Sequence, residues 1–231
     1  MHRALSFVIQ SLVWPIMMKP LFLLFCNFEV KGYERIKDHT APLIFAPNHS
    51  NTLDAFLIPL ALPFLNPFSP IFYVVREKRL YAAHHTNWIK KMVFGGWTFY
   101  IMGGLPYRAN QKDYAVSLEK HAEMLSKKGS ICIFPEGTRT KDGVTLRAHG
   151  GAGYLAFASK RPIVPILIRG TFKTTLKDIL KRKKITVEFF SPLEFSDLFD
   201  KENPEIEEFK KAAEKSLNVI RAAKNEPLVE V

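Results

Sequence analysis

One short polar block in the sequence has side chains that could activate a hydroxyl group. His49 and Asp54 lie five positions apart within residues 48–54, where the only other side chains are uncharged. A histidine with a carboxylate partner can take a proton from an alcohol near neutral pH. Alone, the pair is weak evidence, because the same block is also typical of a helix N-terminus with Asn48 or Ser50 as the cap.

A second block about 80 residues further on strengthens the chemical interpretation. Residues 134–139 read Phe-Pro-Glu-Gly-Thr-Arg, and an arginine in a glycine-containing turn can hold a phosphate. Both blocks follow apolar, strand-like runs, at residues 42–46 and 130–134. Ligands of open α/β sheets bind where the carboxyl ends of strands open into loops. We therefore expect the two blocks to face one crevice and to activate a hydroxyl on a phosphorylated acceptor.

Together the blocks resemble those of the glycerolipid acyltransferases of the 1-acylglycerol-3-phosphate acyltransferase type. That family is characterised by Asn-His-x4-Asp followed by Phe-Pro-Glu-Gly-Thr-Arg. Two further family blocks are similar to residues 103–108 (Gly-Gly-Leu-Pro-Tyr-Arg) and residues 162–166 (Pro-Ile-Val-Pro-Ile), in the same order. The resemblance covers about half of the chain.

The resemblance implies transfer of a fatty acyl group from a thioester donor, acyl-CoA or acyl carrier protein, to the hydroxyl of lysophosphatidic acid or a related lysophospholipid. His49 would be the general base and Asp54 would fix its tautomer. On one continuous helix this spacing would turn the pair about 140° apart, so we expect His49 in the loop and Asp54 in the first turn of the next helix. No cofactor and no metal ion is expected. The predicted substrate-binding residues are Arg108, Glu136, Gly137, Thr138 and Arg139.

Two positions leave alternatives open. Glu136 is interpreted as positioning Arg139, as binding a glycerol hydroxyl, or as a salt-bridge partner that stiffens its turn. His149 stands where the family usually carries a lysine or arginine shortly before a Gly-Ala pair. Neutral histidine binds phosphate less strongly than lysine at pH 7. Arg147 is a candidate replacement, and an acceptor other than lysophosphatidic acid is the alternative.

Composition favours a membrane surface over other anionic partners. The chain of 231 residues carries a net charge of +11, which suits nucleic acid, anionic membranes or acidic substrates. No nucleic-acid-binding motif is visible, and 19 phenylalanines suit a protein that faces lipid. The cysteines Cys26 and Cys132 lie in apolar runs and are interpreted as two buried thiols of a reducing compartment.

The N-terminal residues also favour a membrane surface. Residues 4–28 are apolar and long enough to span a bilayer, but Pro15, Lys19 and Pro20 interrupt them. We expect two shorter helices lying in the membrane interface; a true span and a helix pair covering the protein's own core are the alternatives. The predicted location is membrane-associated, with the catalytic domain facing the cytoplasm.

Alternating elements predict an α/β fold with a mixed, largely parallel sheet flanked by helices and an N-terminal apolar helical appendage. The predicted units are a membrane-associating segment at residues 1–28 and an acyltransferase domain at residues 29–231. His121 is expected to be solvated on the charged side of its helix. The expected strands are 27–32, 42–46, 71–75, 130–134, 163–168 and 185–190, and the expected helices are 53–62, 113–128, 150–159 and 204–223.

Two other functions fit the same residues. A hydrolase would use His49 to activate water on a thioester or phosphoester. A catalytically silent lipid-binding protein would use only the apolar segment and the basic surface. The lysine- and arginine-rich run 181–184 is interpreted either as a solvated turn or as a patch facing acidic lipid heads or acyl-CoA phosphates.

Overall fold

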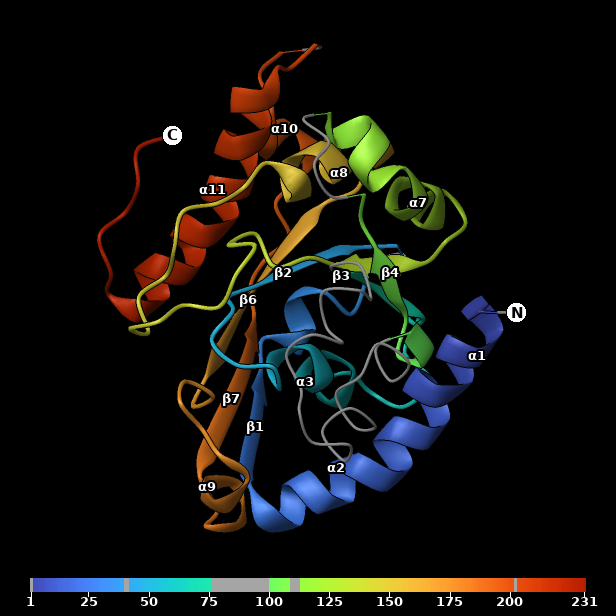
Figure 1. The fold of residues 1–231 in the computed structure, drawn as a ribbon, viewed down its shortest axis with the longest axis vertical. Coiled ribbons are helices and arrows are strands. Elements are labelled where there is room, and N and C mark those ends of the chain that lie inside the picture. Colours follow the sequence, from blue (N-terminus) through green and yellow to red (C-terminus); the bar gives the residue numbers. More distant parts are fainter. Residues whose placement is uncertain (1, 40–41, 76–99, 109–112, 202) are drawn as a thin grey trace.

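The sheet at the centre of the molecule is mixed and largely parallel, as the sequence predicted. The computed structural model describes residues 2–39, 42–75, 100–108, 113–201 and 203–231. Within these residues seven strands form one sheet in the order β1-β7-β6-β2-β5-β3-β4 (Figure 1). The strands are β1 (Asn27–Lys31), β2 (Ile44–Pro47), β3 (Ile71–Val75), β4 (Gly104–Pro106), β5 (Ser130–Cys132), β6 (Ile163–Arg169) and β7 (Lys184–Phe189). Strands β2 to β6 are parallel to one another, whereas β7 runs antiparallel to β6 and pairs in parallel with β1.

Helices cover both faces of this sheet (Figure 1). Helices α2 and α3 share a core with one face, and α7, α8, α10 and α11 share a core with the other. In the part of the chain that the structure describes, the helical segments are α1 (His2–Val8), the π-helix η1 (Ile9–Val13), α2 (Trp14–Phe25), the 3-10 helix η2 (Tyr33–Arg35), α3 (Asp54–Ala61), α7 (Tyr114–Ser126), α8 (Gly151–Ser159), α9 (Leu176–Leu180), α10 (Phe195–Leu198) and α11 (Ile206–Lys224).

Strand β2 shows how the sequence builds the two cores. All four of its residues are buried, and successive side chains point to opposite faces of a strand. Phe45 packs with α3 in one core, whereas Ile44 and Ala46 pack with α7 and α8 in the other. A strand buried on both sides reads as a continuous apolar run, and this is why residues 42–46 could be recognised in the sequence. It also places the end of β2, and the block that follows it, in the middle of the sheet.

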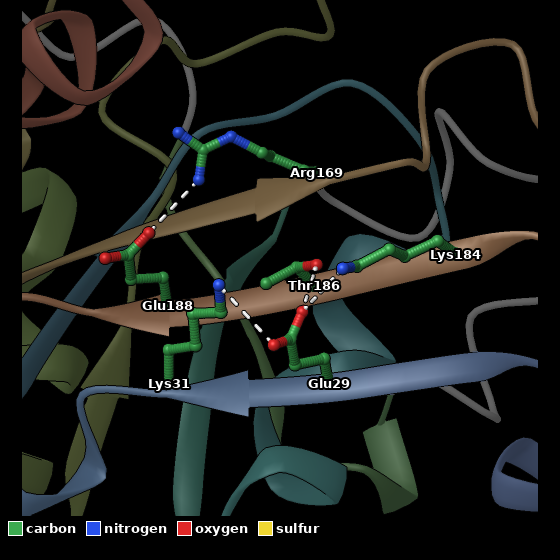
Figure 2. A pocket seen from close by; sticks show the side chains of 6 residues that line it. All are labelled: Glu29, Lys31, Arg169, Lys184, Thr186 and Glu188. Atoms are coloured by element: carbon green, nitrogen blue, oxygen red, sulfur yellow. Dashed lines mark hydrogen bonds and ion pairs between the residues drawn. The ribbon is translucent and has the colours of Figure 1, made fainter.

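The outer face of β1, β7 and the end of β6 is polar. Figure 2 shows the side chains that line a pocket there and point toward one another across the strands: Glu29, Lys31, Arg169, Lys184, Thr186 and Glu188. Their ion pairs join Lys184 to Glu29 at 3.0 Å and Arg169 to Glu188 at 3.1 Å. Such surface pairs contribute little stability, so this face is best described as a solvated edge of the sheet.

Most predicted elements are confirmed to within two residues, but others were missed. The sequence analysis did not identify β4, α9 or α10, which are three to five residues long and too short to show a periodicity. The placement of His121 was wrong. It is fully buried on α7, its Nε2 lies 3.0 Å from the Leu105 carbonyl oxygen, and burial lowers its pKa to about 4. The reason is helical geometry, since His121 lies three residues after Leu118 and so shares its buried stripe.

The N-terminal helices are tied to the sheet by Gln10. This buried side chain donates to the carbonyl oxygens of Ile71 and Met102, both at 2.7 Å, and accepts from the Ile71 N–H at 2.7 Å. Helical structure changes at η1, and α2 continues through Pro20, so Pro20 is not the break that the sequence suggested. The other side of these helices exposes Leu5, Phe7, Val8, Val13, Ile16, Met17, Leu23, Leu24 and Phe25. Across the described part of the chain, no helix has the length and apolar character that crossing a membrane requires.

Candidate functional site

The first polar block forms the turn between β2 and α3. Asn48 fixes the start of this turn, because its Oδ1 accepts from the Ile168 N–H at 2.7 Å and its Nδ2 donates to the Ile168 carbonyl at 3.1 Å. Asn51 fixes the middle by donating to the carbonyl oxygens of Thr171 and Thr174 at 2.9 and 3.1 Å. The turn is thus held on both sides of His49, by the end of β6 and by the segment that follows it.

His49 and Asp54 meet as the sequence predicted. His49 lies in the turn, Asp54 is the first residue of α3, and His49 Nδ1 lies 3.0 Å from Asp54 Oδ2. The same oxygen accepts the N–H groups of Ser50 and Asn51, each at 2.7 Å. The Asp54 side chain is fully buried, and that of His49 is 18% exposed. A carboxylate held in this way makes Nδ1 the donor and leaves Nε2 as the free base.

Phe134 supports the other side of the imidazole. Its ring stacks on the His49 ring with centroids 4.0 Å apart and planes 25° apart. The sequence analysis gave Phe134 no role, although it opens the second block. The ring of His49 is therefore oriented by a carboxylate at one edge and by an aromatic face, which limits its rotation.

Glu136 links the second block to the first. It is 2% exposed, Oε1 accepts from the His49 N–H at 2.7 Å, and Oε2 accepts from the Leu146 N–H at 2.9 Å. Burial raises its pKa to about 7, although the two backbone hydrogen bonds and the positive charges of Lys224 and Arg221 act in the opposite direction. Its role toward the substrate stays a prediction. The structure adds that its carboxylate joins two loops behind the imidazole.

Replacing Glu136 with glutamine should lower the free energy of unfolding by about 1–3 kcal/mol, because an amide offers one acceptor oxygen to two buried N–H donors.

The same variant should change how stability depends on pH. The pKa of Glu136 is raised from 4.5 to about 7 by folding, so between these two pH values the folded chain binds more protons than the unfolded chain. Stability contributed by this group is therefore complete below pH 4.5 and is lost as the pH rises toward 7. Urea unfolding across this range should show a flatter pH dependence for Glu136→Gln. Equal stability and equal pH dependence would contradict this, and exposed Glu207→Gln is the control.

Arg139 lies at the same turn as His49. Its Nη1 donates to Thr52 Oγ1 at 3.0 Å, and the Thr140 N–H donates to the His49 carbonyl oxygen at 2.9 Å. Gly137, Thr138 and Arg139 are all exposed. The two distant blocks therefore meet at one turn, and the guanidinium of Arg139 is bonded to the turn that carries His49.

Position 137 requires a glycine because of its backbone conformation and because His149 lies close to it. Its φ is +64°, and a Cβ there would lie 2.8 Å from the His149 ring. The His149 N–H donates to the Pro135 carbonyl oxygen at 2.8 Å, while the side chain itself is exposed at the rim of the site. Arg147 is exposed as well. Whether either side chain holds the acceptor's head group stays a prediction.

Arg108 lies further from the base than the other predicted residues. It follows β4, and β3 separates β4 from β5 in the sheet. Its guanidinium pairs with Glu119 of α7 at 3.2 Å, and both side chains are more than half exposed. Arg108 thus shares the sheet edge with His49, and its predicted contact with substrate remains untested. The described residues contain no group of three or more His, Cys, Asp or Glu side chains that could hold a metal ion.

Comparisons with known proteins agree on one family. A family model described as Acyltransferase matches residues 27–169. A chloroplastic 1-acyl-sn-glycerol-3-phosphate acyltransferase of Brassica napus is 26% identical over 173 residues, 73% of this chain and 46% of that protein. One from Saccharomyces cerevisiae is 32% identical over 135 residues, 56% of this chain and 39% of that protein. The chain thus spans about half the length, or less, of these relatives.

A solved structure has the same fold. The 1-acyl-sn-glycerophosphate acyltransferase PlsC of Thermotoga maritima superimposes with a TM-score of 0.61 at 22% sequence identity. The match covers 91% of this chain and 77% of that one. The α/β architecture is therefore shared over most of the chain.

Proposed function

Because this chain belongs to the acyltransferase family, we propose that it transfers a fatty acyl group from a thioester donor to the hydroxyl of lysophosphatidic acid or a related lysophospholipid. The observation that carries the proposal is the 3.0 Å contact between His49 and a buried Asp54, with Arg139 bonded to the same turn. The similar proteins are named for this reaction on 1-acyl-sn-glycerol-3-phosphate, which supports the choice of acceptor.

The geometry supports a direct transfer. His49 Nε2 takes the proton of the acceptor hydroxyl as its oxygen attacks the thioester carbonyl carbon. The C–S bond then breaks, and the leaving thiolate takes the proton back from the imidazolium, so no protein side chain is acylated. Asp54 stabilises the imidazolium that forms between the two steps.

The carbonyl oxygen becomes negatively charged during this attack and needs a hydrogen-bond donor. The N–H groups of His49, Ser50, Asn51 and Gly137 already donate to Glu136, Asp54 and the Phe134 carbonyl. We therefore place the oxyanion near the backbone N–H groups of the exposed residues Thr138 and Arg139.

A product assay tests the reaction. Purified protein is incubated with labelled acyl-CoA, or acyl carrier protein, and a panel of lysolipids, and products are identified by mass. Acylated lipid supports the proposal and identifies donor and acceptor. Free fatty acid without acylated lipid would favour the hydrolase, and no turnover with retained lipid binding would favour the silent binder.

Replacing Arg139 with alanine should raise KM for a phosphate-bearing acceptor about 10- to 100-fold, since a charge-assisted hydrogen bond contributes about 1.5–3 kcal/mol. The KM for the thioester donor should stay the same. Steady-state kinetics with each substrate varied in turn measures both values. Lys127→Ala, which removes an exposed cation just after α7, is the control for net charge. An unchanged acceptor KM would refute the phosphate contact.

We also propose that the protein attaches to a membrane surface through α1 and α2. Support comes from the apolar side chains these helices expose, among them Ile16 and Leu24 at 60% and 63%. The basic run 181–184 adjoins the end of α2, since the Asn27 N–H donates to the Lys183 carbonyl oxygen at 3.3 Å. Apolar area combined with nearby cations suits an anionic lipid surface. The free thiols of Cys26 and Cys132 fit a catalytic domain on the cytoplasmic side.

Vesicle flotation tests the attachment. The protein should float with vesicles of phosphatidylcholine and phosphatidylglycerol, and Ile16→Ser with Leu24→Ser should weaken this binding because less apolar area is buried. Leu228→Ser removes an equally exposed leucine near the C-terminus and should bind like the wild type. Equal flotation of all three proteins would exclude α2 as the attachment surface.

A further inference from the structure

The last helix, α11, holds the backbone of a loop next to the site. This loop, residues 143–148, lies between the second block and α8, and in Figure 1 it runs beside the red helix α11. Lys224 donates to the Gly143 carbonyl oxygen at 2.8 Å. Glu226, just after α11, accepts the Thr145 N–H at 3.1 Å. These contacts fix one end of the loop.

A buried ion pair on α11 fixes the other end. Arg221 and Glu214 pair through Nη1 and Oε1, with side chains only 3% and 8% exposed. Glu214 Oε2 accepts the Ala148 N–H at 2.7 Å, and Arg221 Nη2 donates to the Leu146 carbonyl oxygen at 2.7 Å. Burying two charges is costly unless further hydrogen bonds satisfy them, and here the loop backbone supplies those bonds.

Leu146 connects this ion pair to the base. Its carbonyl oxygen accepts from Arg221, and its N–H donates to Glu136, whose other oxygen accepts the His49 N–H. A continuous chain of hydrogen bonds therefore runs from α11 to the backbone of His49. Every member between Arg221 and His49 is buried or half-buried.

We propose that Arg221, held by Glu214, is a positioning residue for acyl transfer. It fixes the Leu146 peptide, and through Glu136 it sets where the His49 turn lies relative to Phe134 and Arg139. Only the expected effect on kcat rests on the proposed function. Arg221 and Glu214 lie beyond residue 169, where the match to the family model ends.

The sharpest test is Arg221→Lys. A lysine keeps the charge beside Glu214, but one ammonium group cannot reproduce the guanidinium fork, which reaches Glu214 and Asn218 through Nη1 and Leu146 through Nη2. Lys210→Arg, an exposed exchange of the same two residue types on α11, is the matched control. Hydrogen exchange followed by mass spectrometry would report on residues 143–148 and on residues 48–51.

Arg221→Lys should speed exchange in both segments and lower kcat about 10- to 100-fold with little change in either KM, since small misplacements of catalytic groups cost this much. Combined with Glu136→Gln, it should add little further loss of kcat, because both changes break one chain of bonds. Lys224→Met, which removes the bonds to Gly143 and Thr145 at the far end of the loop and the ion pair with Glu226, should change exchange and kcat in the same direction by less.

Three outcomes would overturn the proposal. One is normal exchange at residues 48–51 in Arg221→Lys, the second is fully additive loss in the double variant, and the third is a fall in thermal stability with unchanged kcat. If Arg221→Lys does not fold, Lys224→Met carries the same test, and normal exchange at residues 48–51 in that variant overturns the proposal. The exchange measurement needs no substrate. A wild-type protein that acylates no lipid would refute the proposed function while leaving the positioning role open to test.

Discussion

Replacing His49 with alanine is expected to lower kcat about 10²- to 10⁴-fold, the range that a positioned general base contributes. The loss should fall on kcat, because Arg139, the proposed contact for the acceptor's phosphate, keeps its own bond to Thr52. Folding should be preserved, since the His49 backbone keeps its bonds to Glu136 and Thr140. Single-turnover kinetics and thermal unfolding measure the two properties.

The control for this variant is His39→Ala, which removes a histidine outside the turn that faces Glu194 at 3.9 Å. It should transfer acyl groups at the wild-type rate. If His49→Ala were to retain most of its kcat, the base would have to be another group, and the interpretation of the His49–Asp54 pair would be wrong.

Replacing Asp54 with asparagine should reduce kcat about 10³- to 10⁴-fold with little change in shape. The amide oxygen can still accept the N–H groups of Ser50 and Asn51, so the turn should persist. His49 Nδ1 shares that same oxygen, so the tautomer is kept, but a neutral amide no longer stabilises the imidazolium that forms during transfer.

The matching control is Asp113→Asn at the start of α7, where the side chain accepts the Ala115 N–H at 2.7 Å. Asparagine caps a helix about as well as aspartate, so stability and activity should be unchanged. Steady-state kinetics, with circular dichroism to verify the fold, distinguish the two variants. Wild-type turnover by Asp54→Asn would show that the base does not need the negative charge of the Asp54 carboxylate.

Both results depend on a pair that the sequence already identified. The spacing of His49 and Asp54 required a loop followed by a helix, and the structure has that arrangement. The apolar runs before both blocks predicted strands, and β2 and β5 are adjacent in the sheet. These features are local, because alternation, helical stripes and short motifs are complete within a few neighbouring residues.

The role of Glu136 depended on the fold. Its partner His49 lies 87 residues away in sequence and reaches it because β2 and β5 pair in parallel. Its other partner, Leu146, lies ten residues away and is held by Arg221 of α11. No spacing rule could indicate this contact. Phe134 is similar, since its ring meets His49 only across the ends of these two strands.

The sequence by itself predicted the chemistry of the site: which group would take the proton, which carboxylate would orient it, and which arginine would hold the acceptor; the contact between His49 and Asp54 is present in the structure. Only the tertiary structure decided what supports them: Glu136 between two loops, and Arg221 with Glu214 behind Leu146. The physical reason is that reactive groups are fixed by residue type and short spacing. The partners of buried charges are instead chosen by which backbone groups the folded chain leaves to be satisfied.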